Sequence, residues 1–137
     1  MDTLPIYNAT EEEQKFINDS LIEFNNTKIL NKSVFMTVNR CIKDDGEVVG
    51  GILAQTYWGV LHVNILWVKK EYRHNGFASA LVNDAEDIAK KAGCQISHLD
   101  TYDFQAKGLY EKLGYTVFGV LEDCPEGHKH YYMSKKL

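Results

Sequence analysis

The pattern of hydrophobic and polar positions predicts that the chain opens with an amphipathic helix. Thr10 and Glu13 have the spacing of a capping box, in which each side chain bonds the backbone amide of the other residue at a helix start. Apolar residues then recur at near-helical spacing until Asn25 and Asn26. We therefore expect a helix that begins after Thr10 and ends at these two asparagines.

Three strands are expected to follow this helix. The apolar runs are rich in β-branched residues, and turn residues separate them. Because an Asp-Gly step between two apolar runs favours a tight hairpin, we expect neighbouring strands to be antiparallel. The predicted strands cover residues 34–42, 48–56 and 60–68, with turns at Asp44-Asp45-Gly46 and Tyr57-Trp58-Gly59.

From Gly76 the hydrophobic period changes to that of a helix. Alanines and branched apolar residues fall on one face up to Ala92, and Gly93 is placed as a C-terminal cap. Strands grouped early, with helices between the later ones, indicate an α+β or mixed α/β fold in which helices cover a sheet. The remaining predicted elements are a strand over residues 95–101, a short helix over 104–113, and strands over 115–121 and 131–137.

The length and composition indicate one globular domain over residues 1–137. The longest apolar runs are too short to cross a bilayer and the N-terminus lacks a secretion signal, so we expect a cytoplasmic protein without a membrane partner. The 3 cysteines are widely spaced, which favours reduced thiols. The formal charge of −4 disfavours a nucleic-acid partner and is compatible with attraction of amines.

The segment between the third strand and the long helix carries the strongest signal for chemistry. A strand ends at Val68, a charged turn follows, and a loop with small residues enters the helix at Gly76. Backbone amides in such a turn, together with the positive end of the helix dipole, can bind a pyrophosphate. The alternative is an ordinary strand-to-helix connection in which glycine eases the turn. Because the loop lacks the glycine patterns of nucleotide triphosphatases and dinucleotide folds, its spacing indicates an anion site without identifying the ligand.

Two motifs resemble those of the GNAT N-acetyltransferase superfamily. Arg73-x-x-Gly76-x-Ala78 is similar to the Arg/Gln-x-x-Gly-x-Gly/Ala signature, and Ala-Lys-Gly-Leu-Tyr-Glu-Lys-Leu-Gly-Tyr at 106–115 is similar to a second family segment. The resemblance covers Val34 to the C-terminus and extends to small bacterial members whose substrates are largely unassigned. It implies a GNAT-like, mostly antiparallel sheet, flanked by helices and splayed in the middle for acetyl-coenzyme A. It also implies an acyltransferase that moves the acetyl group to a primary amine.

The resemblance further implies which residues bind acetyl-coenzyme A. Backbone groups of Leu66 and Val68 are expected to pair with the pantetheine arm, and an amide near them to polarise the thioester carbonyl. Asp103 stands where many relatives have asparagine, and aspartate accepts hydrogen bonds without donating them. The expected cofactor-binding residues are Leu66, Trp67, Val68, Arg73, His74, Asn75, Gly76, Phe77, Ala78, Ser79 and Asp103.

Tyr110 occupies the position at which this family places a general acid for the departing thiolate. A phenol with a pKa near ~10 is protonated at neutral pH and can donate its proton. The amine is expected to attack the thioester directly, so that holding the two reactants together supplies much of the rate. From the helix pattern alone, the alternative is a tyrosine that packs beside Leu109 and Leu113 with its hydroxyl on a backbone group.

The sequence leaves the acceptor pocket and the base that deprotonates the amine open. The expected pocket residues are Glu23, Trp58, His62 and Asn64. The candidate bases are His62, a water on Asn64, Glu23 and Glu122. His62 has a suitable unperturbed pKa near ~6.5, but a histidine in an apolar strand is more often a hydrogen-bonded core residue.

The sequence also contains one possible metal site and leaves other functions open. Cys124, His128 and His130 have metal-capable side chains, but no fourth ligand has a convincing spacing, so no metal is expected. Two rival functions stay open: a coenzyme-A-binding regulatory or sensor domain without turnover, and an interaction domain whose loop binds nothing. The acceptor is expected to be a small-molecule or peptide amine, which the sequence does not identify. A homodimer through the last strands is expected only by analogy.

Overall fold

The computed structural model describes residues 3–29 and 35–137, which belong to two compact units, one on each side of this gap. The first unit contains helix α1 (Glu11–Asn26), whose limits confirm the predicted helix. The amide of Glu13 donates to Thr10 Oγ1 at 3.2 Å and the amide of Thr10 donates to Glu13 Oε1 at 2.9 Å, so the capping box is present. One domain over residues 1–137 stays a prediction, and the predicted strand start at Val34 lies outside the described residues.

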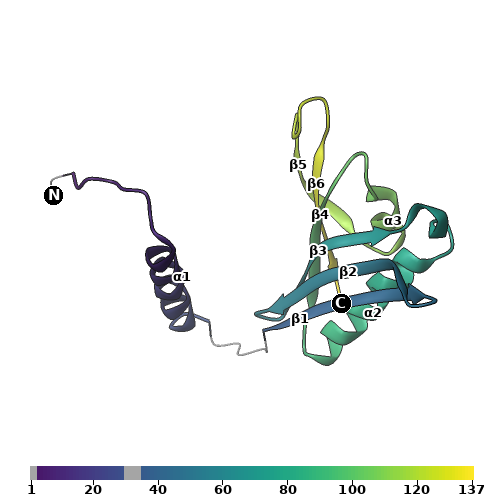
Figure 1. Ribbon diagram of the computed structural model, residues 1–137, viewed down its shortest axis with the longest axis horizontal. Helices are drawn as coiled ribbons and strands as arrows, with labels where there is room; N and C mark the ends of the chain where they lie inside the picture. Colours follow the sequence, from purple (N-terminus) through teal and green to yellow (C-terminus); the bar gives the residue numbers. More distant parts are fainter. Residues whose placement is uncertain (1–2, 30–34) are drawn as a thin grey trace. The chain divides into compact units, whose positions relative to one another are not determined.

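The second unit is built around a sheet of mixed but mostly antiparallel strands (Figure 1). Only the central pair, β3 with β4, is parallel among the strands that the described residues form. This arrangement confirms the predicted fold class. The strands follow one another across the sheet as β1 (Met36–Asp44), β2 (Glu47–Tyr57), β3 (Val60–Val68), β4 (Ile96–Tyr102), β6 (His130–Lys136) and β5 (Thr116–Leu121).

The first two hairpins have the turn geometry that their sequences predict. Asp45 and Gly46 have φ angles of 49° and 81°, and Trp58 and Gly59 have φ angles of 49° and 76°. Two successive residues with positive φ match the right-handed twist of the flanking strands, as in a type I′ turn. The turns therefore fix the antiparallel registers Asp44–Glu47 and Tyr57–Val60 on either side of β2.

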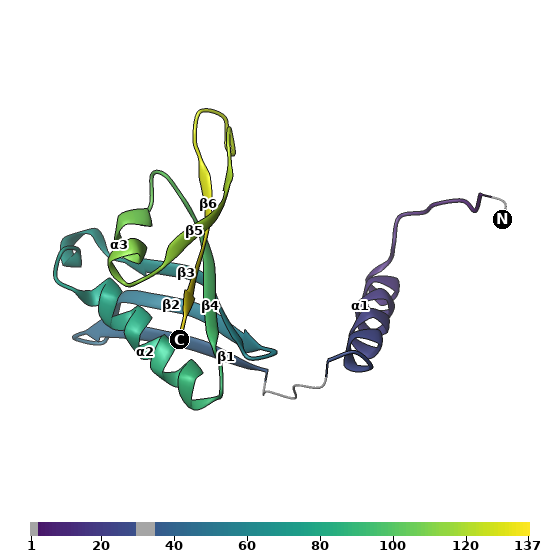
Figure 2. The same cartoon turned by 180° about the vertical axis from the view of Figure 1, so that it is seen from behind.

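Helix α2 (Phe77–Lys91) runs along one face of the sheet (Figure 2). Leu81, Val82, Ala85 and Ala89 are buried on its inner face and join one hydrophobic core with the strands. The helix ends at the predicted place, where Gly93 has a φ of 88°. No helix within residues 3–29 and 35–137 combines the length and apolar character needed to cross a bilayer.

The last helix is shorter than predicted. Helix α3 (Lys107–Lys112) begins three positions after the predicted start at Phe104, because the segment between β4 and α3 forms turns instead. In these turns the Gln105 side chain accepts from the amide of Tyr102 at 2.9 Å, which competes with helical bonding there. A short 3₁₀ helix, Lys70–Tyr72, also lies in the charged turn after β3, where no element was predicted.

Strands β3 and β4 separate part-way along their length. Their parallel pairing runs from Val60–Ile96 to Val63–Leu99 and stops there, although both strands continue. On the other side of β3, the register with β2 shifts between Val63 and Ile65, so that Asn64 is an extra, bulged residue. The bulge coincides with the point of separation, which confirms the predicted splay in the middle of the sheet.

Candidate active site

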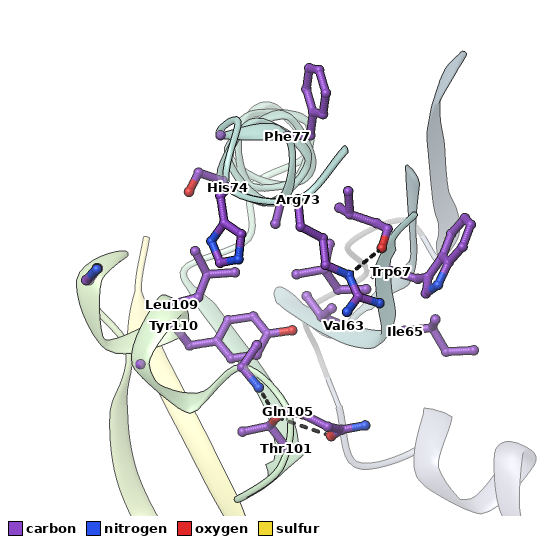
Figure 3. Close-up of a pocket in the computed structure, with 18 of the residues that line it drawn as sticks. Val63, Ile65, Trp67, Arg73, His74, Phe77, Thr101, Gln105, Leu109 and Tyr110 are labelled. Carbon is purple, nitrogen blue, oxygen red and sulfur yellow. Dashed lines mark hydrogen bonds between the residues drawn. The ribbon is translucent and has the colours of Figure 1, made fainter. Parts of the chain in front are cut away.

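A cleft of about 1000 Å³ opens where β3 and β4 separate. Its walls come from the second half of β3, the loop that enters α2, the end of β4 and the helix α3 (Figure 3). The residues that line it are Val63, Asn64, Ile65, Leu66, Trp67, Val68, Tyr72, Arg73, His74, Gly76, Phe77, Ala78, Ser79, Asp100, Thr101, Phe104, Gln105, Ala106, Gly108, Leu109, Tyr110 and Lys112.

One end of the cleft has the geometry of an anion site. His74 and Gly76 both have left-handed backbone conformations, with φ angles of 63° and 81°. The first backbone bond of helix α2 runs from the amide of Ala80 to the carbonyl of Gly76 at 3.0 Å, so the amides of the preceding helical residues are available to a ligand. The first turn of α2 contains no acidic residue that could compete for these amides. The helix start therefore offers unpaired donors and a positive dipole end to a diphosphate.

Side chains on both sides fasten this loop to the sheet. Tyr72 donates its hydroxyl proton to Asp44 at 2.6 Å, and Lys69 pairs with Glu47 at 2.7 Å. Arg73 Nε donates to the carbonyl of Val68 at 2.9 Å, which ties the loop back to the end of β3. These contacts link the loop to the hairpin of β1 and β2, so its backbone is held in place before any ligand binds.

Tyr110 forms part of the opposite wall. Its ring is buried in the core, with 6 % of the residue exposed, and no residue described in the structure accepts a hydrogen bond from its hydroxyl. No described side-chain polar atom is both fully buried and without a partner, so this hydroxyl reaches the open cleft. Figure 3 shows it pointing into the space between Arg73 and the wall formed by Thr101 and Gln105. Burial, with a smaller effect of the Asp100 carboxylate, raises the pKa of Tyr110 to about 12.

A splayed sheet, a helix start with the geometry of an anion site and a buried tyrosine on α3 are the features that the two sequence motifs lead one to expect. The profile of the Acetyltransferase (GNAT) family matches residues 3–115. The chain belongs to this family. It is accordingly an acetyl-coenzyme-A-dependent acetyltransferase.

Individual acetyltransferases resemble the chain over much of its length. A blasticidin-S acetyltransferase of Streptomyces morookaense is 38% identical over 93 residues, which is 67% of this chain and 68% of that protein. The acetyltransferase Atu2258 of Agrobacterium fabrum is 33% identical over 130 residues, or 94% of each chain. The crystal structure of an acetyltransferase from Bacillus cereus superposes with a TM-score of 0.93 at 35% identity and covers 98% of both chains.

Most of the residues expected to bind the cofactor of this GNAT enzyme line the cleft. The exceptions are Asn75 and Asp103. Asn75 Nδ2 instead donates to the carbonyls of Tyr72 and Arg73, at 3.2 and 3.1 Å, and so shapes the loop from behind. Those that line the cleft are Leu66, Trp67, Val68, Arg73, His74, Gly76, Phe77, Ala78 and Ser79.

The carboxylate of Asp103 is committed to the connection between β5 and β6. Asp103 Oδ1 lies 2.8 Å from His128 Nδ1, and Oδ2 accepts from the amide of Lys129 at 2.9 Å. The backbone bond to Lys129, helped by His128, lowers the pKa of Asp103. A direct cofactor contact by Asp103 stays a prediction.

The residues expected in the acceptor pocket are dispersed. Asn64 lines the cleft at the bulge of β3, whereas Trp58 lies in the turn between β2 and β3. His62 stacks on His98 with ring centroids 4.5 Å apart, below the point where the strands separate. Glu23 lies on α1 in the first unit. Of the three expected pocket residues in the second unit, Asn64 is the one that lines the cleft as the described residues form it.

Several cleft residues of this acetyltransferase were not predicted. Asp100 and Thr101 come from the end of β4, and Phe104 and Gln105 from the turns after it. Their signal in the sequence was their position, at the end of a short strand or directly after it. Without knowing that β4 is the neighbour of β3, that position could not be assigned to the site. In the segment with metal-capable side chains, the two histidines have separate hydrogen-bond partners: His128 bonds Asp103, and His130 bonds Asp100.

Proposed function

We propose that this acetyltransferase transfers the acetyl group of acetyl-coenzyme A to an amine by direct attack, with Tyr110 as the general acid. One observation carries the proposal: the Tyr110 hydroxyl opens onto the same cleft whose other end is the anion-binding start of α2. A single molecule with a diphosphate at one end and a thioester at the other would span these two features.

The donor set of the cleft fits the cofactor. The amides of residues 74–79 are proposed to bind the diphosphate, with Arg73 beside them, because the first turn of α2 contains no competing carboxylate. On the β4 side, backbone groups of Leu66 and Val68 have no strand partner, because the pairing with β4 stops at Val63. The Val68 carbonyl accepts from Arg73 Nε, so the backbone groups of Leu66 and the amide of Val68 are the ones available to a pantetheine arm. Acetyl-coenzyme A supplies the activated acyl group, and an amide of β3 near its carbonyl oxygen would stabilise negative charge there.

Tyr110 is suited to hold a proton until the sulfur needs it. With a pKa of about 12, the phenol is almost entirely protonated at neutral pH. In the proposed reaction the amine nitrogen forms a bond to the carbonyl carbon, the carbon–sulfur bond breaks, and the phenolic proton passes to the departing thiolate. The acylated nitrogen releases one proton to solvent as the neutral amide forms, and the phenolate recovers a proton from solvent through the open cleft.

The cofactor and the acceptor are proposed to enter from opposite faces of the sheet. Side chains alternate along a strand, so Asp100 and Thr101 point to opposite faces of β4, yet both line the cleft. The buried face of β4, which carries Thr101, is the one covered by α2 and α3. The acceptor would therefore approach from the side of Asp100. Amine-bearing small molecules are proposed as acceptors, in keeping with the relative named as a blasticidin-S acetyltransferase.

The test is thiol release from acetyl-coenzyme A in the presence of a panel of amines, with the acetylated product identified by mass spectrometry. Amine-dependent thiol release together with a product heavier by one acetyl group supports the proposal. Tight binding of acetyl-coenzyme A with no thiol release for any amine would instead favour the sensor function. Thiol release without an amide product would indicate hydrolysis and contradict transfer to nitrogen.

A further inference from the structure

A histidine–aspartate pair lies on the acceptor face of the cleft and has no role in the mechanism above. His130 on β6 is 8 % exposed, and its Nε2 lies 2.7 Å from Asp100 Oδ2 on β4. The imidazole stacks on Tyr102, with ring centroids 4.2 Å apart, and contacts the tilted ring of Tyr132, with centroids 4.7 Å apart. Its other nitrogen, Nδ1, is 4.0 Å from Cys124 Sγ. A buried ring in contact with two tyrosines has little freedom to turn, so it fixes the direction of the Asp100 carboxylate.

Asp100 itself remains open to a ligand. Its side chain is 39% exposed, it lines the cleft, and it follows Leu99, the last residue of β4 that pairs with β3. Oδ2 is taken by His130, but no hydrogen bond to Oδ1 is formed by the residues that the structure describes. Nor does any described lysine or arginine form an ion pair with Asp100. A carboxylate with a free oxygen and no lysine or arginine partner, facing a cleft, is a site for a cation.

The charged side chains that line the cleft come from different elements. Its cationic side chains, Arg73 and Lys112, come from the loop before α2 and from α3, whereas Asp100 comes from β4. Phe104 also lines the cleft, with 59 % of its surface exposed, and stacks at 5.3 Å on Tyr102, the ring that in turn stacks on His130. Aromatic faces next to a carboxylate favour a cation, and a delocalised or alkylated cation most of all. The anionic cofactor would thus meet the cationic side chains of Arg73 and Lys112, and a cationic acceptor would meet the carboxylate of Asp100.

We infer that Asp100, oriented by His130, binds a cationic group of the acceptor other than the amine that is acetylated. This inference rests on the proposed function and deepens it by naming the acceptor class: amines that carry a second ammonium or guanidinium group. The bound cation cannot be the reacting nitrogen, because an amine held as ammonium on a carboxylate has no lone pair for attack. Asp100 is therefore a specificity-determining residue, and His130 is a positioning residue.

The experiment compares straight-chain diamines, from ethylenediamine to cadaverine, each with the monoamine of the same chain length. For the wild-type protein we expect kcat/KM to favour the diamine by at least about tenfold at the best length, since a charged hydrogen bond is lost in the monoamine. Asp100→Asn should reduce kcat/KM for diamines roughly tenfold to a hundredfold and change the values for monoamines by less than about twofold. The KM for acetyl-coenzyme A should not change in this variant.

His130 is tested with two substitutions. His130→Leu removes the donor to Asp100 and should lose part of the diamine preference, mainly through the KM of the diamine. His130→Gln keeps an N–H donor near the position of Nε2 and should restore much of it. If His130→Leu does not fold, the comparison of Asp100→Asn with the wild type still decides the inference, since the amide preserves the size of the side chain.

A binding experiment distinguishes a failure of this inference from a failure of the proposed function. Calorimetric titration of the best diamine into coenzyme-A-saturated protein measures docking without turnover, and Asp100→Asn should weaken it by at least about tenfold. Asp100-dependent diamine binding without thiol release would contradict the proposed function and support the inference. Equal losses for monoamines and diamines in Asp100→Asn, or a wild-type protein with no preference for the second charge in either arm, would overturn the inference.

Discussion

The ring of Tyr110 packs edge-on against the ring of Tyr115, with centroids 5.8 Å apart and planes inclined by 66°. Tyr115 is held in turn by a buried polar network: its hydroxyl donates to Glu86 Oε2 at 2.7 Å and accepts from Ser97 at 2.7 Å. Lys135 Nζ donates to the other oxygen of Glu86 at 2.8 Å. The ring of Tyr115, against which Tyr110 packs, is therefore held in place by a hydrogen-bond network with residues of α2, β4 and β6.

Removal of the Tyr115 hydroxyl should lower the stability of the fold. Tyr115→Phe leaves the buried Glu86 carboxylate with one partner fewer, so we expect the free energy of unfolding to fall by about 1–3 kcal/mol. Chemical denaturation monitored by circular dichroism measures the change. Tyr72→Phe is the matched control, because its hydroxyl bonds the exposed Asp44, and it should cost less than about 1 kcal/mol. Equal stabilities of the two variants would mean that the buried network contributes nothing beyond packing.

Loss of the Tyr110 hydroxyl should slow turnover without weakening cofactor binding. Tyr110→Phe keeps the ring that packs in the core and removes only the proton donor, so kcat is expected to fall roughly 10²-fold or more. The affinity for acetyl-coenzyme A, measured by calorimetry, should stay near that of the wild type. Tyr131→Phe, at a tyrosine outside the cleft, is the control and should retain full turnover. Unchanged kcat in Tyr110→Phe would remove this residue from the role of acid.

The pH profile of turnover should lack an alkaline limb near the ordinary pKa of tyrosine. The general acid acts in its protonated form, and burial raises its pKa from 10.0 to about 12. Because the active form then persists up to that higher value, kcat should not fall between about pH 9 and 11. A fall centred near pH ~10 that disappears in Tyr110→Phe would show that the phenol titrates normally and is not shielded.

The pair of stacked histidines should make the fold sensitive to acid. Burial, and to a smaller extent the neighbouring His62, lower the pKa of His98 below 6.5. The Asp100 carboxylate opposes them with a smaller effect. The unfolded chain then binds a proton at a higher pH than the folded protein does, so this histidine reduces the free energy of unfolding as the pH falls below about 6.5. His98→Gln should lose part of this pH dependence in denaturation series at several pH values. His74→Gln, at an exposed histidine, is the control, and identical pH dependence in both variants would contradict the assignment.

The sequence predicted the features that depend on residues close together in the chain. The Asp45-Gly46 and Trp58-Gly59 turns, the capped start of α1 and the loop before α2 all follow from local backbone preferences. The start of α3 was predicted too early because the Gln105 side chain bonds the amide of Tyr102, a local competition that the apolar pattern does not encode.

The parts of the site that were missed depend on contacts between distant segments. Asp100 and His130 are 30 positions apart, and their pairing follows from the antiparallel register of β4 with β6, in which Asp100 lies opposite Tyr132. The bulge at Asn64, which frees the second half of β3, likewise follows from its register with β2. Side-chain alternation alone gives no sign of either, because it is set within one strand.

The proposed function requires that the diphosphate of acetyl-coenzyme A binds the start of α2. The affinity of the Gly76→Val variant for acetyl-coenzyme A tests this requirement directly. Gly76 has a φ of 81° and open space around the position of a Cβ atom, so the branched side chain would strain the loop and fill the space in front of the amides. Gly93→Val is the matched control, since Gly93 has a φ of 88° and equally open surroundings at the other end of the helix. We predict that the Kd for acetyl-coenzyme A rises at least about 100-fold in Gly76→Val and less than about threefold in Gly93→Val. A Gly76→Val protein that is folded and binds acetyl-coenzyme A as tightly as the wild type would contradict the account.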